Sequence, residues 1–482
     1  LAGCADGVPV SVDIDVEPTP VAAIATATPI VCNGDNVDVD ITTPSSTTAA
    51  HTFDLVVTST NMGATGGTAF ADLAGQAYPL TINGTLINNS NSVITVTFTA
   101  TPKLAGCADG TPVSVDIDVE PTPVAAIATT TPIVCNGDNV DVDITTPSST
   151  TAAHTFDLVV TSTNMGATGG TAFANLAGQA YPLSINGTLI NNSNSVITVT
   201  FTVTPKLAGC ADGVPVSVDI DVEPTPVAAI VTTTPIVCNG DNVDVDITTP
   251  SSTTAAHTFD LVVTSTNMGA TGGTAFADLA GQAYPLTING TLINNSNSVI
   301  TVTFTATPKL AGCADGAPVS VDIDVEPTPA ADITTTTPLV CDGDNVDVDI
   351  ATLSTTLAAQ SFDVVVTSTN MGATGGTAFA DLAGQAYPLT INGTLTNNSN
   401  SVITVTFTVT PQLAGCADGT PVSVDIDIEP TPVADIATTT PIVCNGDNVD
   451  VDITTPSTTT AAHTFDLVVT STNMGATAGT AF

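Results

Sequence analysis

The stretch VSVDIDVEPTP, at Val10–Pro20, decides the fold because it marks the end of one repeat and the start of the next. Its first eight residues alternate between Val or Ile and Ser, Asp or Glu, so the apolar side chains share one face and the acids the other. This period of two predicts a half-buried β-strand. Pro18 and Pro20 have no N–H to donate to a sheet, so they end the strand. The stretch therefore predicts a strand that runs into a joint.

The whole chain repeats with a period of 103 residues. The seven-residue segment LAGCADG marks each period, beginning at Leu1, Leu104, Leu207, Leu310 and Leu413. Such a period indicates a tandem array of small domains. We assign the C-terminal strand of a preceding module to 1–17, four modules to 18–120, 121–223, 224–326 and 327–429, and a partial module to 430–482. Because the chain begins and ends inside a repeat, we expect it to be part of a longer protein.

One repeat contains about seven short strands separated by turn signals. In the module 18–120 we expect strands at 22–31, 37–42, 53–57, 80–87, 94–100 and 113–119, with the least regular segment at 68–78. This number of alternating strands in about 100 residues is typical of an immunoglobulin-like sandwich. The predicted fold is all-β, with tandem immunoglobulin-like β-sandwich modules of 103 residues arranged as an extended rod.

The charge excludes several partners. The chain has 46 acidic residues, three lysines and no arginine, and its formal net charge is −43. Nucleic acids and anionic membrane surfaces both need Lys and Arg, so we expect neither as a partner. No apolar run approaches the roughly 18 residues of a membrane span. The 43% of apolar residues, in strict alternation, indicate a folded chain and not a disordered acidic one.

Two segments resemble a known family. They are TPIVCNGDNVDVDI at Thr28–Ile41 and TVTFTATPKLAGCADGTPVSVDIDVEPTP at Thr95–Pro123. Together they resemble the PKD-like or immunoglobulin-like tandem modules of very large surface proteins of Bacteroidota, which have a Cys-x-Gly turn near the start and a Gly-Cys hairpin before the last strand. The resemblance covers about 40 residues of every repeat. It implies an extracellular or cell-surface location and a stalk, adhesin or matrix fibre.

The ten cysteines occur two per period, which in an extracellular repeat indicates disulfides. Cys32 follows the first strand and Cys107 precedes the last. In an immunoglobulin topology these two connections lie at opposite ends of a module, roughly 30 Å apart, whereas a disulfide needs Cα atoms within about 7 Å. The first turn of one module instead faces the last hairpin of the next, which predicts Cys32–Cys210, Cys135–Cys313 and Cys238–Cys416. An in-module bridge through another topology, and free thiols, are the alternatives.

Acidic residues suggest one metal site. The same topology brings Asp35 and Glu120 of one module toward Asp212 of the next, and Ca²⁺ prefers carboxylate and carbonyl oxygens. We therefore consider calcium at each joint, with no other cofactor. The alternative is that the acids form solvated strand faces that discourage edge-to-edge pairing. His51 is expected to be a loop residue, and Lys103, which becomes Gln412 in the fourth repeat, is not expected to form an isopeptide bond.

These observations predict a structural protein and not an enzyme, because no nucleophile–base pair is present. We expect the repeats to form a stiff spacer or filament body in an extracellular fibre or a cell-surface adhesin stalk. The alternative is a multivalent carbohydrate- or protein-binding protein with one weak site per module, for which the irregular segment 58–78 is the place to look. The expected partners are neighbouring modules of the same chain, other copies in a filament, and surface glycans.

Overall fold

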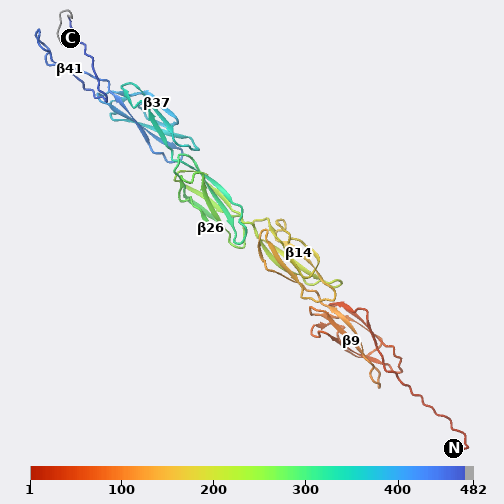
Figure 1. Ribbon diagram of the computed structural model, residues 1–482. Coiled ribbons are helices and arrows are strands. Elements are labelled where there is room, and N and C mark those ends of the chain that lie inside the picture. Colours follow the sequence, from red (N-terminus) through yellow and green to blue (C-terminus); the bar gives the residue numbers. More distant parts are fainter. Residues whose placement is uncertain (1, 473–482) are drawn as a thin grey trace. The chain divides into compact units, whose positions relative to one another are not determined.

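The structure is a computed structural model that describes residues 2–472. Figure 1 shows β-strands gathered repeat by repeat, with β9 (Ile94–Lys103), β14 (Thr155–Ser162), β26 (Leu279–Ala283) and β37 (Leu389–Thr394) labelled in successive repeats. Each of these four repeats has a hydrophobic core of its own. The described part of the chain contains no helix long and apolar enough to span a bilayer.

Each complete repeat is a sandwich of two sheets. In the first repeat, the three-stranded sheet has the order β1-β3-β7, formed by Ala23–Thr26, Asn36–Thr42 and Leu80–Thr85. The five-stranded sheet has the order β2-β10-β9-β4-β6, formed by Ile30–Cys32, Val113–Glu120, Ile94–Lys103, Thr52–Ser59 and Leu73–Ala77. A short pair, β5 and β8, joins Thr65–Gly66 to Ile87–Asn88. The order of strands confirms the predicted immunoglobulin-like, all-β fold.

The same ten strands recur in the next three repeats. They run from β11 (Ala126–Thr129) to β20 (Val216–Glu223), from β21 (Ala229–Thr232) to β30 (Val319–Glu326) and from β31 (Ala331–Thr335) to β40 (Val422–Glu429). Two further strands, β41 (Asp435–Thr438) and β42 (Val451–Thr454), pair in the partial repeat. The chain divides into two units, one holding Leu1–Pro226 with the loops Ser251–Ala256 and Ala311–Ala314, and the other holding the rest. Each unit is described by itself below.

The expected first strand at 22–31 is in fact two strands in different sheets. β1 pairs antiparallel with β3, whereas β2 pairs parallel with β10. Pro29 lies between them and cannot donate to a ladder, so the pairing is interrupted there and the chain crosses to the other sheet. The carbonyl of Pro29 accepts a hydrogen bond from the N–H of Asp118, which starts the new pairing. The single-strand prediction was therefore wrong, and the crossing places Cys32 at the end of β2.

The core follows the alternation of β9. Ile94, Val96, Phe98 and Ala100 are all buried, and the threonines between them face outward. These side chains pack against Ile117 and the other inward residues of β10, β3 and β4 in one cluster. Burying apolar area in this way is the main favourable term for a module of this size.

Threonine hydroxyls hold the acids on the outer face of the five-stranded sheet. Thr95 donates to Asp118 and Thr97 donates to Asp116, each at 2.7 Å, across the β9–β10 ladder. The same pairs occur in the second, third and fourth repeats. Neutral donors therefore solvate carboxylates in a chain that has only three lysines, and the acids on this face match the solvated-strand interpretation.

The copy of VSVDIDVE at 10–17 is exposed and has no ladder partner among residues 2–472, whereas the same eight residues form β10 at 113–120. Its assignment to the C-terminal strand of a preceding module stays a prediction. In β10 the ladder partners are β9 and β2. An alternating pattern needs neighbouring strands to become a strand, because an isolated extended segment leaves its apolar face in water.

Candidate functional site

The repeated site lies where one repeat meets the next, and we call it the joint. In the first joint it comprises the turn at 32–35, the end of β10 at Glu120, the loop at 146–154 and the hairpin at 207–213. Asn-Gly in the turn supplies Gly34, whose φ of 88° is accessible to glycine at low cost. All of these segments belong to the first unit.

Disulfides link the turn to the hairpin of the following repeat. Cys32 and Cys210 are bonded with a Cα–Cα distance of 5.5 Å, which lies within the usual range. The structure contains the same bond at two further joints, Cys135–Cys313 and Cys238–Cys416, with the same 178-residue separation. These are the pairs that the topological argument named. The other four cysteines, Cys4, Cys107, Cys341 and Cys444, are free and exposed.

Asn33 connects the turn to the linker that follows β10. Its amide nitrogen donates to the hydroxyl of Thr122 at 2.8 Å, and its carbonyl oxygen accepts from the N–H of Asn88 at 2.8 Å. In the fourth repeat Asp342 takes this position. There the Thr431 hydroxyl becomes the donor to the carboxylate, at 2.7 Å. The rotatable hydroxyl allows either residue to make the connection.

Asn88 is a buried hydrogen-bond centre. It is 2% exposed, and its amide nitrogen donates to the carbonyls of Ser92 and Val119, both at 2.8 Å. Its carbonyl oxygen accepts from the N–H and the hydroxyl of Ser90. The repeated Asn-Asn-Ser-Asn pattern gave no signal for this role, because polar clusters of that kind usually mark exposed loops.

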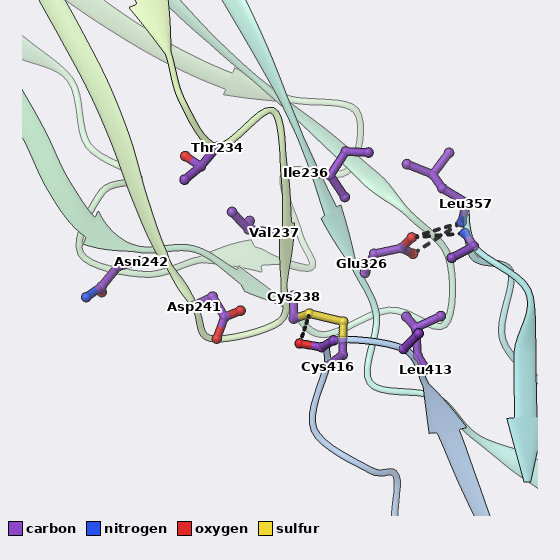
Figure 2. A pocket seen from close by; sticks show the side chains of 13 residues that line it. Thr234, Ile236, Val237, Cys238, Asp241, Asn242, Glu326, Leu357, Leu413 and Cys416 are labelled. Carbon is purple, nitrogen blue, oxygen red and sulfur yellow. Dashed lines mark hydrogen bonds between the residues drawn. A yellow bond between two sulfur atoms is a disulfide. The ribbon is translucent and has the colours of Figure 1, made fainter.

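Glu120 joins β10 to the loop of the next repeat. Its side chain is 3% exposed, and it accepts hydrogen bonds from the N–H and the hydroxyl of Thr151, the first at 3.0 Å. Burial raises the pKa of Glu120, and the N–H of Thr151 acts in the opposite direction. In the second unit Glu326 makes the same contact with the N–H of Leu357 at 3.0 Å (Figure 2). A buried carboxylate with only neutral donors therefore holds each of these joints.

We expect Glu120→Ala to lower the stability of the docked loop at the first joint by about 1–3 kcal/mol, because the substitution leaves the N–H of Thr151 without an acceptor. Glu120→Gln keeps an acceptor and should cost less.

Burial raises the pKa of Glu120 above its value in an undocked loop, so the docked state binds the proton more tightly. The wild-type joint should therefore gain stability relative to Glu120→Gln below the undocked pKa, and lose that gain as pH rises through the docked pKa. Thermal unfolding of the full chain between pH 4 and pH 7 tests this sign. A difference that grows with rising pH would contradict it.

The backbone also crosses the joint. The N–H of Ser149 donates to the carbonyl of Asn91 at 2.8 Å, and the N–H of Val93 donates to the carbonyl of Ser149 at 3.1 Å. This is a one-residue parallel bridge between Ser92 and Ser149, and it recurs at the other joints. Backbone pairs of this kind fix the distance between the two segments more closely than long side chains can.

A groove lies beside the Cys238–Cys416 bond (Figure 2), and another lies beside the Cys32–Cys210 bond. In the second unit it has a volume of about 570 Å³ and is lined by Ile236, Glu326, Leu357 and the hairpin Leu413–Cys416. Its counterpart at Cys32 in the first unit has about 430 Å³. The only titratable groups in the lining are Asp241 and Glu326, and Glu326 is already hydrogen bonded to the loop. The arrangement holds two repeats together and presents no nucleophile beside a base.

The three residues proposed for calcium do not meet at one point. Glu120 accepts a hydrogen bond from Thr151, and Asp212 forms an ion pair with Lys206 at 3.1 Å. Asp35 lines the groove at Cys32, where Glu120 also lies, but Asp212 does not. Within residues 2–472 no group of three or more His, Cys, Asp or Glu side chains is arranged to hold a metal ion. Calcium binding at the joints stays a prediction for titration, without a three-carboxylate site formed in advance.

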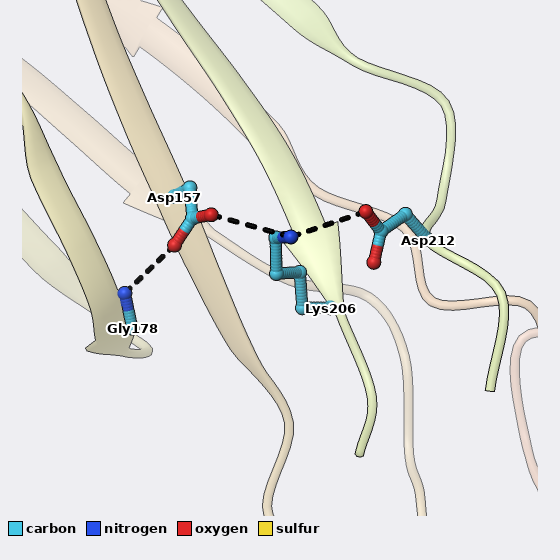
Figure 3. Close-up of polar contacts among 4 residues, drawn as sticks. All are labelled: Asp157, Gly178, Lys206 and Asp212. Carbon is cyan, nitrogen blue, oxygen red and sulfur yellow. Dashed lines mark hydrogen bonds and ion pairs between the residues drawn. The ribbon is translucent and has the colours of Figure 1, made fainter. Parts of the chain in front are cut away.

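The lysines each bridge two carboxylates. Figure 3 shows Lys206 between Asp157, at 3.3 Å, and Asp212, at 3.1 Å, while Asp157 also accepts from the N–H of Gly178 at 2.8 Å. The hydrogen bond from Gly178 lowers the pKa of Asp157, and the one to Asp212 raises the pKa of Lys206. An amine held in its charged form is not a nucleophile, so an isopeptide bond is not favoured here. In the fourth repeat Gln412 replaces the lysine and donates to Asp363 at 3.1 Å.

His51 ties together the two ends of its loop. Its ring nitrogens lie 2.8 Å from the hydroxyl of Thr43 and 2.9 Å from that of Thr47, and its ring packs against Tyr78. Gln360, its counterpart in the fourth repeat, makes both equivalent hydrogen bonds to threonine hydroxyls. A glutamine can replace the histidine because the role is to hold the loop, which agrees with the expectation of a loop residue.

The match to a protein-family model agrees with this architecture. A family model described as a PKD-like domain matches residues 29–123, 132–226, 235–329 and 338–432. The sequence matches no curated protein. Among solved structures, the D1–D4 ectodomain fragment of ICAM-5 is 12% identical, with 85% of this chain and 100% of that chain covered and a TM-score of 0.32. The N-terminal eight Ig domains of Down syndrome cell adhesion molecule are 8% identical, with 87% of this chain and 49% of that chain covered and a TM-score of 0.23. For α-2-macroglobulin of Escherichia coli the identity is 10%, the covered shares are 88% of this chain and 41% of that chain, and the TM-score is 0.20. TM-scores this low carry no conclusion about function.

Proposed function

Because the chain belongs to the PKD-like domain family, we propose that it is the structural repeat region of an extracellular fibre or a cell-surface adhesin stalk. Its modules act as a stiff spacer or filament body. The observation that supports this role most directly is the joint, where a disulfide, a buried carboxylate and a backbone bridge all connect consecutive repeats.

The location follows from the same bonds. Disulfides persist in oxidising compartments and are rare in the cytosol, so three joints closed by disulfides favour an extracellular site. Thermodynamically, an array of this kind behaves as a sum of module stabilities and neighbour interfaces. Strengthening the interfaces without changing the cores is then the direct way to make such an array stiff.

We assign no catalytic role to the chain. Several residues that could act as acids, bases or nucleophiles have structural partners. Glu120 holds a loop, His51 holds a loop, and Lys206 is fixed between two carboxylates. A reaction would need such a group to face a substrate, and these face their neighbours.

Removing the disulfides tests the spacer role. We expect the chain with Ser at the six bridged cysteines to keep its module unfolding temperatures within a few degrees, because each module has a hydrophobic core of its own and each bond spans a joint. Small-angle X-ray scattering should show a broader distribution of intramolecular distances, since the joints then move more freely.

The matched control is Cys107→Ser with Cys444→Ser, which removes two free and exposed thiols and should change neither quantity. Unchanged scattering in the six-residue variant would argue against disulfides as the source of stiffness. A large drop in module unfolding temperature would instead mean that the bonds stabilise the modules themselves.

A multivalent binding role is the second candidate. Met62 is 56% exposed, and its counterparts in the next three repeats have 57%, 58% and 57% exposure at the same turn. An exposed methionine repeated at one place suits a weak, adaptable contact. The segment 58–78, expected to be irregular, is held to the neighbouring strand by a hydrogen bond, since Asp72 accepts from the N–H of Val57 at 2.7 Å. Binding of the full chain to a glycan array, lost when the four methionines are replaced by Ser, would favour this role over the spacer.

A further inference from the structure

The loop that docks onto the preceding repeat contains a histidine with a hydroxyl group on each side of its ring. In the first joint this docking loop is 146–154, which contacts the preceding module through Thr151. His154 is half-buried at the end of the loop. Its Nε2 lies 2.9 Å from the hydroxyl of Thr146, and its Nδ1 lies 3.0 Å from the hydroxyl of Thr150. The imidazole therefore connects the two ends of the docking loop.

Both hydroxyl groups already donate to a backbone carbonyl. Thr146 donates to the carbonyl of Val124 at 2.7 Å, and Thr150 donates to the carbonyl of Ala152 at 2.5 Å. Because a hydroxyl has one proton to donate, each threonine can only accept a hydrogen bond from the imidazole. A neutral imidazole has one N–H group, whereas the imidazolium ion has two. The imidazolium ion therefore satisfies both threonines, and the neutral ring satisfies one of them.

The first repeat has the same set of hydrogen bonds around His51. The hydroxyl of Thr43 donates to the carbonyl of Val21 at 2.7 Å, and the hydroxyl of Thr47 donates to the carbonyl of Ala49 at 2.6 Å. The two ring nitrogens of His51 contact these same hydroxyls. The arrangement is thus a property of the repeat and not of a single loop.

The fourth repeat shows how a neutral side chain is accommodated at this position. Gln360 donates to Thr356 at 3.0 Å, but its carbonyl oxygen accepts from the hydroxyl of Thr352 at 2.9 Å. Thr352 then lies 3.3 Å from the carbonyl of Ala330, whereas the equivalent distance is 2.7 Å in the first two repeats. The N–H of Leu353 donates to this carbonyl instead, at 2.9 Å.

The histidine loops do not have this second donor. The position of Leu353 is occupied by Pro44 in the first repeat and by Pro147 in the second, and proline has no N–H. If Thr146 turned its hydroxyl toward a neutral imidazole, the carbonyl of Val124 would lose its hydrogen bond. Glutamine and leucine in the fourth repeat therefore form one matched pair, and histidine and proline form the other.

We propose that the docking loop of the first joint is sensitive to pH, because the imidazolium form of His154 stabilises it and loss of the ring proton destabilises it. The proposal rests on the spacer role and adds a regulation of its joint. Two further features favour the charged ring. The ring of Tyr181 lies 5.1 Å from the imidazole between centroids, within the range of a cation–π contact. The formal net charge of −43 also favours a bound proton.

The other titratable groups on the surrounding elements have defined states. Tyr181 keeps its proton, because burial raises its pKa to about 12. Glu120 of the preceding module accepts from Thr151, and Asp157 on β14 belongs to an ion pair. Burial lowers the pKa of His154. The two threonine acceptors and the tyrosine ring act in the opposite direction, since they interact best with the charged form.

Protonation of His154 and docking of its loop are linked. The docked loop binds the ring proton more tightly than the undocked loop, whose histidine has the ordinary pKa of about 6.5. The added stability of the docked loop is therefore fully present below about pH 6.5 and is lost as the pH rises through the docked pKa. Gln360 does not titrate, so docking of the loop 352–360 should not change over this range.

Nuclear magnetic resonance of the chain with ¹⁵N-labelled histidine measures the protonation state, and the chain has only four histidines. The signal of His154 is the one that disappears in the double variant Pro147→Leu with His154→Gln, which copies the fourth repeat. We expect its pKa to lie about one unit above the reference value of about 6.5, a common size of shift in folded proteins. Thr150→Val removes one acceptor and should move the pKa back toward the reference. A wild-type pKa at or below the reference, or no change in Thr150→Val, would overturn the proposal.

Hydrogen exchange of the same chains tests docking itself. The loop 352–360 is an internal reference, because the ratio of exchange rates in the two loops cancels the ordinary effect of pH on amide exchange. Between about pH 5.5 and about pH 8, protection of 146–154 relative to 352–360 should fall by up to about tenfold in the wild type, which corresponds to one pKa unit. The ratio should stay constant in the double variant.

A constant ratio in the wild type, or an equal fall in the double variant, would contradict the proposal. Either result would leave the spacer role intact, because that role is tested by scattering of the variant without joint disulfides. Conversely, unchanged scattering in that variant would leave the titration of His154 as measured. The two ideas can therefore fail separately.

Discussion

Replacing Phe98 by Ala should lower the free energy of unfolding of the first module by about 3–5 kcal/mol, the usual cost of a large core truncation. Phe98 is 0% exposed and lies at the centre of β9, where it packs with residues of both sheets. The surrounding strands are held by ladders on both sides of β9, so they can collapse only partly into the cavity. A loss of this size removes much of the stability of a small domain.

Chemical denaturation of the full chain measures this effect. The four complete modules are nearly identical, so the variant should unfold in two steps, with about a quarter of the signal lost at lower denaturant concentration. The control is Val56→Ala on the outer face of β4, where the side chain is 46% exposed and the change should stay within about 0.5 kcal/mol. A single transition shifted as a whole would show that the modules do not unfold independently.

The sandwich could be predicted from the sequence because its long strands alternate without interruption. In β9 the pattern assigns every inward residue correctly, from Ile94 to Ala100. The crossing between sheets at Pro29 could not be predicted with the same certainty, because a proline between two apolar runs also fits a bent single strand.

The joint could be predicted in outline from topology alone. The opposite ends of a sandwich determine which turn meets which hairpin, and this placed Cys32 with Cys210 and brought Glu120 to the same place. The hydrogen-bond donor to Glu120 could not be predicted, because it is the backbone N–H of Thr151 in a polar loop. Every residue except proline has such an N–H, so the sequence does not single out one of them. Carboxylates near one another in a predicted joint therefore suggested calcium, whereas in the structure Glu120 accepts from Thr151 and Asp212 pairs with Lys206.

Gly213→Ala should disrupt the first joint more than any other single-methyl change in its hairpin. A Cβ at this position would lie 1.9 Å from the carbonyl oxygen of Pro123 and 2.6 Å from the ring of Pro205. The first of these is backbone and cannot rotate away, so the hairpin must move off the linker. We expect a cost of about 2–3 kcal/mol, at the upper end for overpacking, together with slower closure of the Cys32–Cys210 bond.

Gly209→Ala is the matched control, because Gly209 lies in the same LAGCADG segment but has no close contact that an added methyl would meet. Gly209 has a φ of 82° and open space around its Cβ direction, so alanine there costs only the left-handed backbone penalty, roughly 1–2 kcal/mol. Unfolding curves and the rate of disulfide formation in glutathione buffer will order the two variants. If Gly213→Ala proves no worse than Gly209→Ala, the hairpin does not rest on the linker, and the disulfide alone must align the two repeats.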